Sequence, residues 1–334
     1  MNRYWRLDRH PQGTDFAAAL TLAEEPLRRP GDGEVLIRNH YLSLDAGTRL
    51  WMTSRTDGYQ PPLPLGSPMK GLVLGEVVAS RSPGVNPGDL VRAFGQWADH
   101  SLLRPEESVL RVLDRSVSDP RQHLGVLGPN ALTAYVGLTE TAATLPGETV
   151  LVSAAAGATG TLAAQIARNM GCRVIGLAGG AAKCRFLLED LQLAAAVDYK
   201  ADDVAARLAT LGPIHVYFDN VGGPLLDSVL PNMALAGRVA ICGLIATYGA
   251  ETPTPGPMHF DQVLMKRLTI KGFFAPDFWH RGDEVISRMR AWLDAGQIRM
   301  RFDVSHGLDA APVAYGKLFS GANIGKVLVD LRNG

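Results

Sequence analysis

Hydrophobic and polar positions follow two different patterns along the chain. Up to about residue 120, short apolar stretches such as 33–38, 72–79 and 89–93 are separated by turns rich in glycine and proline, for example 82–84 and 86–89. These residues suit tight turns because glycine tolerates unusual backbone angles and proline fixes one of them. The first third of the chain is therefore predicted to be β-rich.

From about Thr149 onward, short apolar strands alternate with stretches of helical spacing, such as 162–170 and 283–295. Strands joined by crossover helices pair in parallel, so this part predicts a doubly wound parallel sheet of the Rossmann type. The expected strands are 149–154, 173–178, 197–199, 214–219, 237–243 and 268–273. A later helix, 310–319, precedes a strand, 325–331, that is expected to return to the β-rich module.

Composition narrows the choice of partner. The chain has 334 residues, which suffices for two domains, and its 33 Lys and Arg residues balance 33 Asp and Glu residues. Without a basic excess, nucleic acids and membrane surfaces are poor partners, so a small-molecule substrate is expected. No apolar run reaches the roughly 18 residues that span a bilayer, and no apolar signal core stands at the start, so we expect a cytoplasmic protein.

The cysteines predict no redox or metal role. Cys172, Cys184 and Cys242 show no C-x-x-C spacing and have no histidine cluster beside them. Neither a disulfide framework nor a structural zinc site is expected, and the three thiols are predicted to be buried or inert.

The sharpest local signal is the stretch 154–160, Ala-Ala-Ala-Gly-Ala-Thr-Gly, between the first parallel strand and a helix. Small residues at such a turn let backbone N–H groups and the helix N-terminus approach a pyrophosphate. Gly157 and Gly160 occupy the second and third glycine positions of G-x-G-x-x-G, with Ala155 in the first. Such runs also form plain packing turns, but the strand, helix, strand order favours dinucleotide binding.

Charge after the second strand bears on which dinucleotide binds. NAD sites usually place an acid there for the ribose hydroxyls, whereas the stretch 179–183 reads Gly-Gly-Ala-Ala-Lys. Lys183 would attract a 2′-phosphate, so NADP(H) is favoured over NAD(H); a solvated lysine at a helix start is the alternative. At the end of the fourth strand, Asn220 could hydrogen-bond the cofactor. Asp219 precedes it and could have a structural role instead, as a cap of the next turn.

Together these motifs resemble the medium-chain dehydrogenase/reductase superfamily. The stretch 85–91, Val-Asn-Pro-Gly-Asp-Leu-Val, resembles the V-x-x-G-D-x-V turn of its GroES-like domain. Other segments resemble the zinc-free branch of prostaglandin/leukotriene reductases, bacterial curcumin reductases and plant alkenal double-bond reductases; these are 42–45, 75–80, 132–138, 217–223, 241–248 and 323–326. The resemblance implies a GroES-like substrate and catalytic domain, residues 1–125 and 300–334, and a Rossmann NADP-binding domain, residues 126–299.

The resemblance also implies a reaction. Zinc alcohol dehydrogenases of the superfamily carry a catalytic Cys in the β domain and a Gly-His-Glu motif, but here no Cys precedes Cys172 and the matching stretch is Leu74-Gly75-Glu76. No metal is therefore expected. The branch reduces the C=C bond of α,β-unsaturated ketones or aldehydes with NADPH, delivering hydride to the β-carbon and a proton to the α-carbon. Quinone reduction and a non-catalytic NADPH-binding role are the alternatives.

Site residues follow from the resemblance position by position. The implied contacts of NADP(H) are Ala156, Gly157, Ala158, Thr159 and Gly160 at the pyrophosphate, Lys183 and Tyr199 at the adenosine half, and Asn220, Cys242, Gly243, Tyr248, Phe273 and Asn323 toward the nicotinamide. Tyr248 matches the tyrosine thought to act in catalysis, and Tyr59 matches one that faces the substrate. For both tyrosines the alternative is a buried ring in the packing. Relatives also imply a homodimer.

Two departures from the family pattern bear on specificity. The family segment Asp-Pro-Tyr-Met-Arg stands here as 45–49, Asp-Ala-Gly-Thr-Arg, so Gly47 replaces a tyrosine near the substrate. The stretch before Lys183 also lacks the serine and the Glu-Lys pair of relatives, which removes one hydroxyl for the 2′-phosphate. The substrate pocket is expected to be wider or less polar at Gly47, and the preference for NADP(H) weaker.

Overall fold

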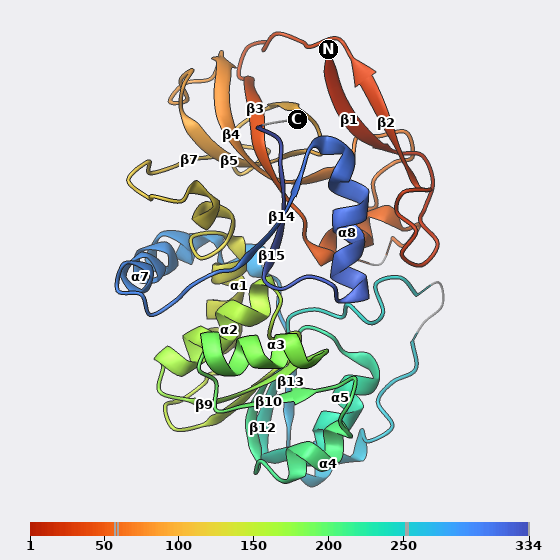
Figure 1. Ribbon diagram of the computed structural model, residues 1–334, viewed down its shortest axis with the longest axis vertical. Helices are drawn as coiled ribbons and strands as arrows, with labels where there is room; N and C mark the ends of the chain where they lie inside the picture. The colour runs from red at the N-terminus through yellow and green to blue at the C-terminus, as the bar shows by residue number, and fades with distance from the viewer. Residues whose placement is uncertain (57, 59, 251–253, 333–334) are drawn as a thin grey trace. The chain divides into compact units, whose positions relative to one another are not determined.

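The computed structural model describes residues 1–56, 58, 60–250 and 254–332, and the chain divides into two compact units (Figure 1). One unit comprises Met1–Leu124 and Phe302–Gly334, and the other comprises Gly125–Arg301. Over the described ranges, no helix has both the length and the apolar character needed to cross a membrane. Cys172, Cys184 and Cys242 are free thiols.

The first unit is built on β-strands, as its turn pattern predicts. Its large sheet runs in the order β14-β15-β3-β4-β5-β7, with β6 paired to β3, and β1 and β2 form a separate pair. The strands are β1 (Asn2–Leu7), β2 (Leu20–Glu25), β3 (Val35–Ser43), β4 (Lys70–Ser80), β5 (Leu90–Gln96), β6 (His100–Leu103), β7 (Arg111–Val112), β14 (Phe302–His306) and β15 (Lys326–Asp330). The helical elements are η1 (Ala46–Met52), η2 (Pro120–Leu124), η7 (Leu308–Ala310) and α8 (Ala311–Ser320).

The end of the chain returns to this β-rich unit, as expected. β15 pairs antiparallel with β3, with Asp330 opposite Tyr41, and β14 pairs in parallel with β15. Figure 1 shows the blue C-terminal strands beside β3, which lies near the red end of the colour scale. The core beneath includes Phe16 and Tyr315, whose ring centroids are 4.5 Å apart.

The second unit holds a six-stranded parallel sheet in the order β10-β9-β8-β11-β12-β13. This third-second-first-fourth-fifth-sixth order is that of a doubly wound dinucleotide fold, so the predicted fold class is confirmed. The strands are β8 (Thr149–Val152), β9 (Arg173–Ala178), β10 (Ala195–Asp198), β11 (Ile214–Asp219), β12 (Met233–Ile241) and β13 (Thr269–Gly272). The α-helices are α1 (Pro129–Val136), α2 (Ala158–Asn169), α3 (Ala181–Arg185), α4 (Val204–Ala209), α5 (Gly223–Val229), α6 (Asp261–Met265) and α7 (Gly282–Asp294).

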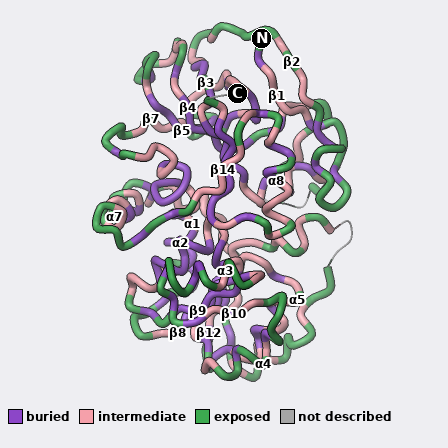
Figure 2. Tube along the Cα trace, in the orientation of Figure 1, coloured by how far each residue is buried: buried purple, intermediate pink, exposed green. Residues whose placement is uncertain are grey.

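Burial explains why these strands read as continuous apolar runs. All four residues of β8 are buried, as are five of the six residues of β9, because parallel strands are covered on both faces. Figure 2 shows this buried interior along β8 and β9. The edge strand β13 differs, since it has one neighbour and three of its four residues are exposed.

Two boundaries differ from the expectation. β12 begins at Met233 rather than 237, and Ala236 bends it with a φ of +57° where the pairing with β11 shifts register. α2 begins at Ala158, within the glycine run that was expected to open a helix, whereas apolar residues at helical spacing marked only 162–170. The first turn of α2 is made of small residues, which carry no periodic signal.

Candidate functional site

The turn after β8 is closed too tightly for a side chain at its second glycine. Ala154 adopts a φ of +47°, and α2 starts four residues later. A Cβ added to Gly160 would lie 2.2 Å from the carbonyl oxygen of Ala154 and 2.8 Å from its carbonyl carbon. The stretch 154–160 therefore folds into a turn in which residue 160 has no room for a side chain beside the Ala154 carbonyl.

This turn presents unused donors. Ala158, Thr159 and Gly160 form the first turn of the 12-residue helix α2, and among the described residues their N–H groups have no hydrogen-bond partner. Such groups carry the partial positive charge of the helix N-terminus and suit phosphate oxygens. Asn130 fixes the neighbouring Thr159 hydroxyl through a 3.0 Å hydrogen bond. The residues present fit a pyrophosphate.

The strand order reverses between β8 and β11, and polar groups gather where these two strands end. Asp219 is fully buried there, and its Oδ1 accepts hydrogen bonds from the Ser153 and Tyr217 hydroxyls. The same oxygen accepts from the N–H groups of Val221 at 2.9 Å and Gly222 at 3.0 Å. Asp219 therefore caps the turn, as the structural alternative proposed, and fixes the loop at this edge of the sheet.

Asn220 follows at the switch point. Its Nδ2 donates to the Ser153 carbonyl at 2.7 Å, and its backbone N–H donates to Ser153 Oγ at 2.8 Å. Both bonds hold the carboxamide against the end of β8. Within the part of the chain that the structure describes, its Oδ1 has no partner, so it can accept a hydrogen bond from a ligand hydroxyl or amide.

Tyr248 lies beside Asn220 and Gly243. A Cβ added to Gly243 would lie 3.0 Å from the Tyr248 hydroxyl and 3.3 Å from the Asn220 carbonyl oxygen. The carboxyl ends of β11 and β12 therefore bring these three residues together. Cys242 lies there too, and burial together with the Asp219 charge raises the pKa of its thiol to about 12. A thiol with that pKa stays protonated near neutral pH and is a poor nucleophile.

A cationic group stands at the end of β9. A Cβ added to Gly179 would lie 2.7 Å from the Tyr199 hydroxyl and 2.9 Å from Lys200 Cε, so both side chains lie over the glycine. The backbone N–H groups of Gly180 and Lys200 share Asp198 Oδ1, which sets Lys200 beside the start of α3, where Lys183 lies. Burial and the charge of Lys200 lower the pKa of Lys183. We call Lys183, Tyr199 and Lys200 the lysine cluster.

The nearby acid, Asp198, is held by the turn, and the backbone hydrogen bonds that it accepts lower its pKa. Asp198 Oδ1 accepts hydrogen bonds from the backbone N–H groups of Gly180 at 2.8 Å and Lys200 at 3.0 Å. Its carboxylate is thus engaged by the turn. The cluster can therefore hold a group with two negative charges, such as a 2′-phosphate.

Sequence reasoning selected Lys183 and Tyr199 but missed Lys200. Parallel pairing of β10 with β9 sets Asp198 opposite Ala178, and this pairing carries residues 199 and 200 to the side of Gly179. A doubly wound fold could have supplied the signal, because the third strand of such a sheet lies beside the second.

The remaining predicted residues lie as follows. Ala156 is buried inside the glycine turn, and the ring of Phe273 packs against Phe218 with centroids 6.3 Å apart. Asn323 belongs to the β-rich unit, where it is buried and its Nδ2 donates to the Gly325 carbonyl at 3.0 Å. Tyr59 lies outside the described residues. Among the described residues, no group of three or more His, Cys, Asp and Glu is placed to hold a metal ion.

Comparison with known proteins gives matches over nearly the whole chain. A model described as the N-terminal domain of oxidoreductase matches residues 3–112, and one described as zinc-binding dehydrogenase matches residues 158–291. The chain is 37% identical to the NADPH-dependent curcumin reductase of Escherichia coli, over 98% of this chain and 96% of the relative. It is also 37% identical to the NADP⁺-dependent 2-alkenal reductase of Nicotiana tabacum, over 90% of this chain and 88% of the relative.

A solved structure agrees with these matches. CurA from Vibrio vulnificus in complex with NADPH is 36% identical to this chain and superposes with a TM-score of 0.93, covering 99% of both chains.

Proposed function

This chain belongs to the zinc-free branch of the medium-chain dehydrogenase/reductase superfamily, and from that premise we propose that it reduces the C=C bond of α,β-unsaturated ketones or aldehydes with NADPH. It is an NADP(H)-dependent oxidoreductase, as its relatives are. The observation that carries the proposal is the lysine cluster at the end of β9, which supplies two cations for the 2′-phosphate.

In the proposed complex, the N–H groups of Ala158, Thr159 and Gly160 hold the pyrophosphate oxygens. Lys183 and Lys200 face the 2′-phosphate, with the Tyr199 ring beside the adenosine. Asn220 Oδ1 accepts a hydrogen bond from the ribose or carboxamide and orients the nicotinamide half. The bound coenzyme supplies a hydride.

The substrate end is assigned to Tyr248. When hydride reaches the β-carbon, the π electrons move toward the carbonyl oxygen, which becomes an enolate oxygen. The Tyr248 hydroxyl donates a hydrogen bond to that oxygen and so stabilises the developing charge. The α-carbon then takes a proton, and the product is a saturated ketone or aldehyde.

A substrate panel tests the proposal. Purified protein with NADPH, chelator and an enone, an enal, a quinone or a saturated ketone is followed at the nicotinamide absorbance, and the products are identified. The enone and the enal should be reduced to saturated carbonyl compounds. A hydroquinone as the only product would support quinone reduction, and NADPH binding without turnover of any acceptor would support a non-catalytic role; either result contradicts the proposal.

Replacing Tyr248 with phenylalanine tests the assigned hydroxyl. The expected result is a fall in kcat of about 100-fold or more, with the KM for NADPH changed by less than about threefold. The matched control is Tyr135→Phe, which removes a hydroxyl from a tyrosine on α1 whose ring lies under Arg281 and Arg288. Steady-state kinetics measures both variants, and equal kcat values for them would contradict the role.

We also propose that two copies join along β13. Among the described residues β13 pairs only with β12, and exposed apolar residues lie on β12 and on the segment before β13; they are Leu235, Met258, Phe260, Leu264 and Met265. An exposed apolar group of this kind beside an open sheet edge favours association. Sedimentation should give twice the chain mass of 35.8 kDa, and Leu264→Glu should shift it toward one chain mass. A wild-type protein of one chain mass would contradict the dimer.

A further inference from the structure

A cavity of about 530 Å³ lies in the β-rich unit, on residues that have no role in the coenzyme site. Its base is a row of three side chains across neighbouring strands, because register sets His306 on β14 opposite Asp330 on β15, and Asp330 opposite Tyr41 on β3. The short helix η2 and the residues before it line the cavity with Asp119 and Arg121. Its volume is in the range of small-molecule sites.

Arg332 stands on one side of the cavity in a fixed position. Its Nε donates to Asp330 Oδ1 at 3.0 Å and its Nη2 to Asp330 Oδ2 at 2.7 Å. The guanidinium also lies over the Tyr41 ring, 4.6 Å from the centroid. A carboxylate along one edge and a ring under one face leave little freedom for this side chain.

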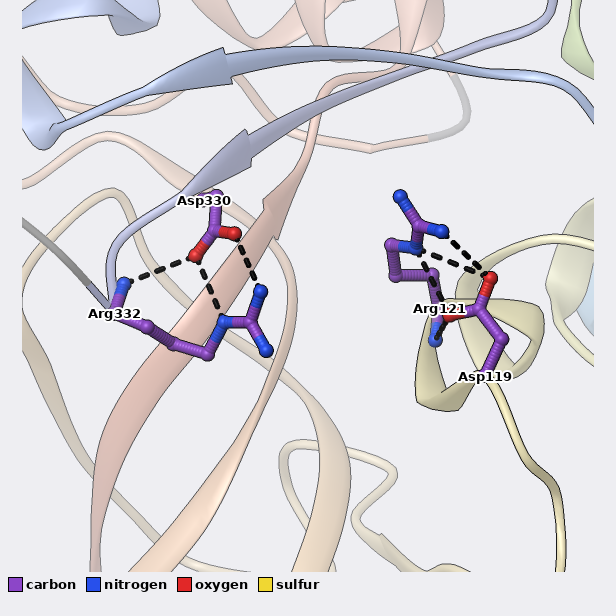
Figure 3. Close-up of polar contacts among 4 residues, drawn as sticks. All are labelled: Asp119, Arg121, Asp330 and Arg332. Atoms are coloured by element: carbon purple, nitrogen blue, oxygen red, sulfur yellow. Dashed lines mark hydrogen bonds and ion pairs between the residues drawn. The ribbon is translucent and has the colours of Figure 1, made fainter.

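Arg121 repeats the arrangement on the η2 side. Its Nε and Nη2 donate to Asp119 Oδ1 and Oδ2, both at 2.9 Å, and its guanidinium lies over the Phe302 ring, 4.9 Å from the centroid. Figure 3 shows the two Asp–Arg pairs, one at the end of the C-terminal strand and one on the short helix. Both pairs line the same cavity.

Each of the two guanidinium groups keeps donors that its aspartate does not use. Both carboxylates already accept from their own arginine, whereas Nη1 of Arg121 and Nη1 of Arg332 have no partner among the residues that the structure describes. The hydrogen bonds with Asp119 and Asp330 raise the pKa of Arg121 and of Arg332, so both stay charged. Pro120 and Val304 add apolar surface.

We propose that this cavity binds a small organic anion. A carboxylate or phosphate group of the ligand accepts hydrogen bonds from the Nη1 groups of Arg121 and Arg332, and its apolar body lies on Pro120 and Val304. The two aspartates cancel the formal charge of the two arginines, so recognition depends on the placed donors rather than on net charge. The proposal does not rest on the proposed function, since none of these residues contributes to the coenzyme site.

Calorimetric titration tests it on the full chain saturated with NADP⁺, which keeps phosphate probes away from the lysine cluster. The probes are benzoate, phenyl phosphate and inorganic phosphate, at constant ionic strength in chloride. Benzoate and phenyl phosphate should bind saturably at one site. Arg121→Gln and Arg332→Gln should each weaken both by at least about tenfold.

Arg6→Gln is the matched control, because Arg6 also holds an aspartate two residues away through Nε and Nη2, but outside the cavity. It should change binding by less than about twofold. Arg332→Lys keeps the positive charge and removes the planar set of guanidinium donors, so it should weaken binding severalfold. This variant takes the place of the glutamine variants if they prove unstable to heat. The proposal is overturned by non-saturable heats, by cavity variants that bind like wild type, or by inorganic phosphate binding as tightly as phenyl phosphate.

Discussion

Replacing Gly160 with alanine should disrupt coenzyme binding more than any other single methyl group added to the chain. The new Cβ would lie 2.2 Å from the Ala154 carbonyl oxygen, so the turn between β8 and α2 has to open. The N–H groups of Ala158 and Thr159 then lose their common direction. We expect affinity for NADPH to fall by about 30-fold or more and the free energy of unfolding by about 2 kcal/mol.

Fluorescence titration with NADPH and urea unfolding measure the two effects in Gly160→Ala. The control is Gly316→Ala on α8, where a Cβ meets no atom within 4 Å. That variant should keep its affinity and gain a few tenths of a kcal/mol, up to about 1, from helix propensity. Wild-type affinity in Gly160→Ala would show that the turn does not hold the pyrophosphate.

The second large effect is expected at the lysine cluster. Lys183→Ala and Lys200→Ala should each raise the KM for NADPH by about tenfold or more, because a charged hydrogen bond to phosphate contributes roughly 1.5–3 kcal/mol. The KM for NADH should change little, since NADH has no 2′-phosphate. The double variant should lose most of the preference for NADPH.

Steady-state kinetics with both coenzymes measures the lysine effects, with Arg207→Ala as a control that removes a cation from the exposed surface of α4. Parallel losses with NADPH and NADH would refute the assigned role. The preference should also depend on pH. Burial and Lys200 lower the pKa of Lys183, and only charged lysine attracts the phosphate, so the preference should decline as pH rises toward that lowered value.

The sheet of the second unit was predictable because its central strands are short apolar runs between helical stretches. That pattern arises from burial on both faces, which the structure shows for β8 and β9. The start of β12 was not predictable in the same way. Residues 233–236, Met-Ala-Leu-Ala, suit a helix as well as a strand, and the bend at Ala236 depends on pairing with β11.

The candidate site residues show the same difference between positions set by local sequence and positions set by strand pairing. The glycine turn, Lys183 and Asn220 could be proposed from the sequence because each follows a strand that its own residues predict. Lys200 was missed because its place depends on which strand lies next to β9. No sequence pattern indicated the cavity that is proposed to bind an anion, because its residues Tyr41, Arg121, His306 and Arg332 come from four separate segments. In the sequence alone, each of them resembles an ordinary surface residue.

The central claim is that hydride from NADPH reaches the β-carbon of an activated alkene. The direct measurement uses NADPH with deuterium in place of both hydrogens at C4 of the nicotinamide, an enone as acceptor, and NMR of the product. The account predicts a saturated ketone with one deuterium on the β-carbon and a proton from solvent on the α-carbon. Deuterium on the carbonyl carbon, as in an allylic alcohol, would contradict it.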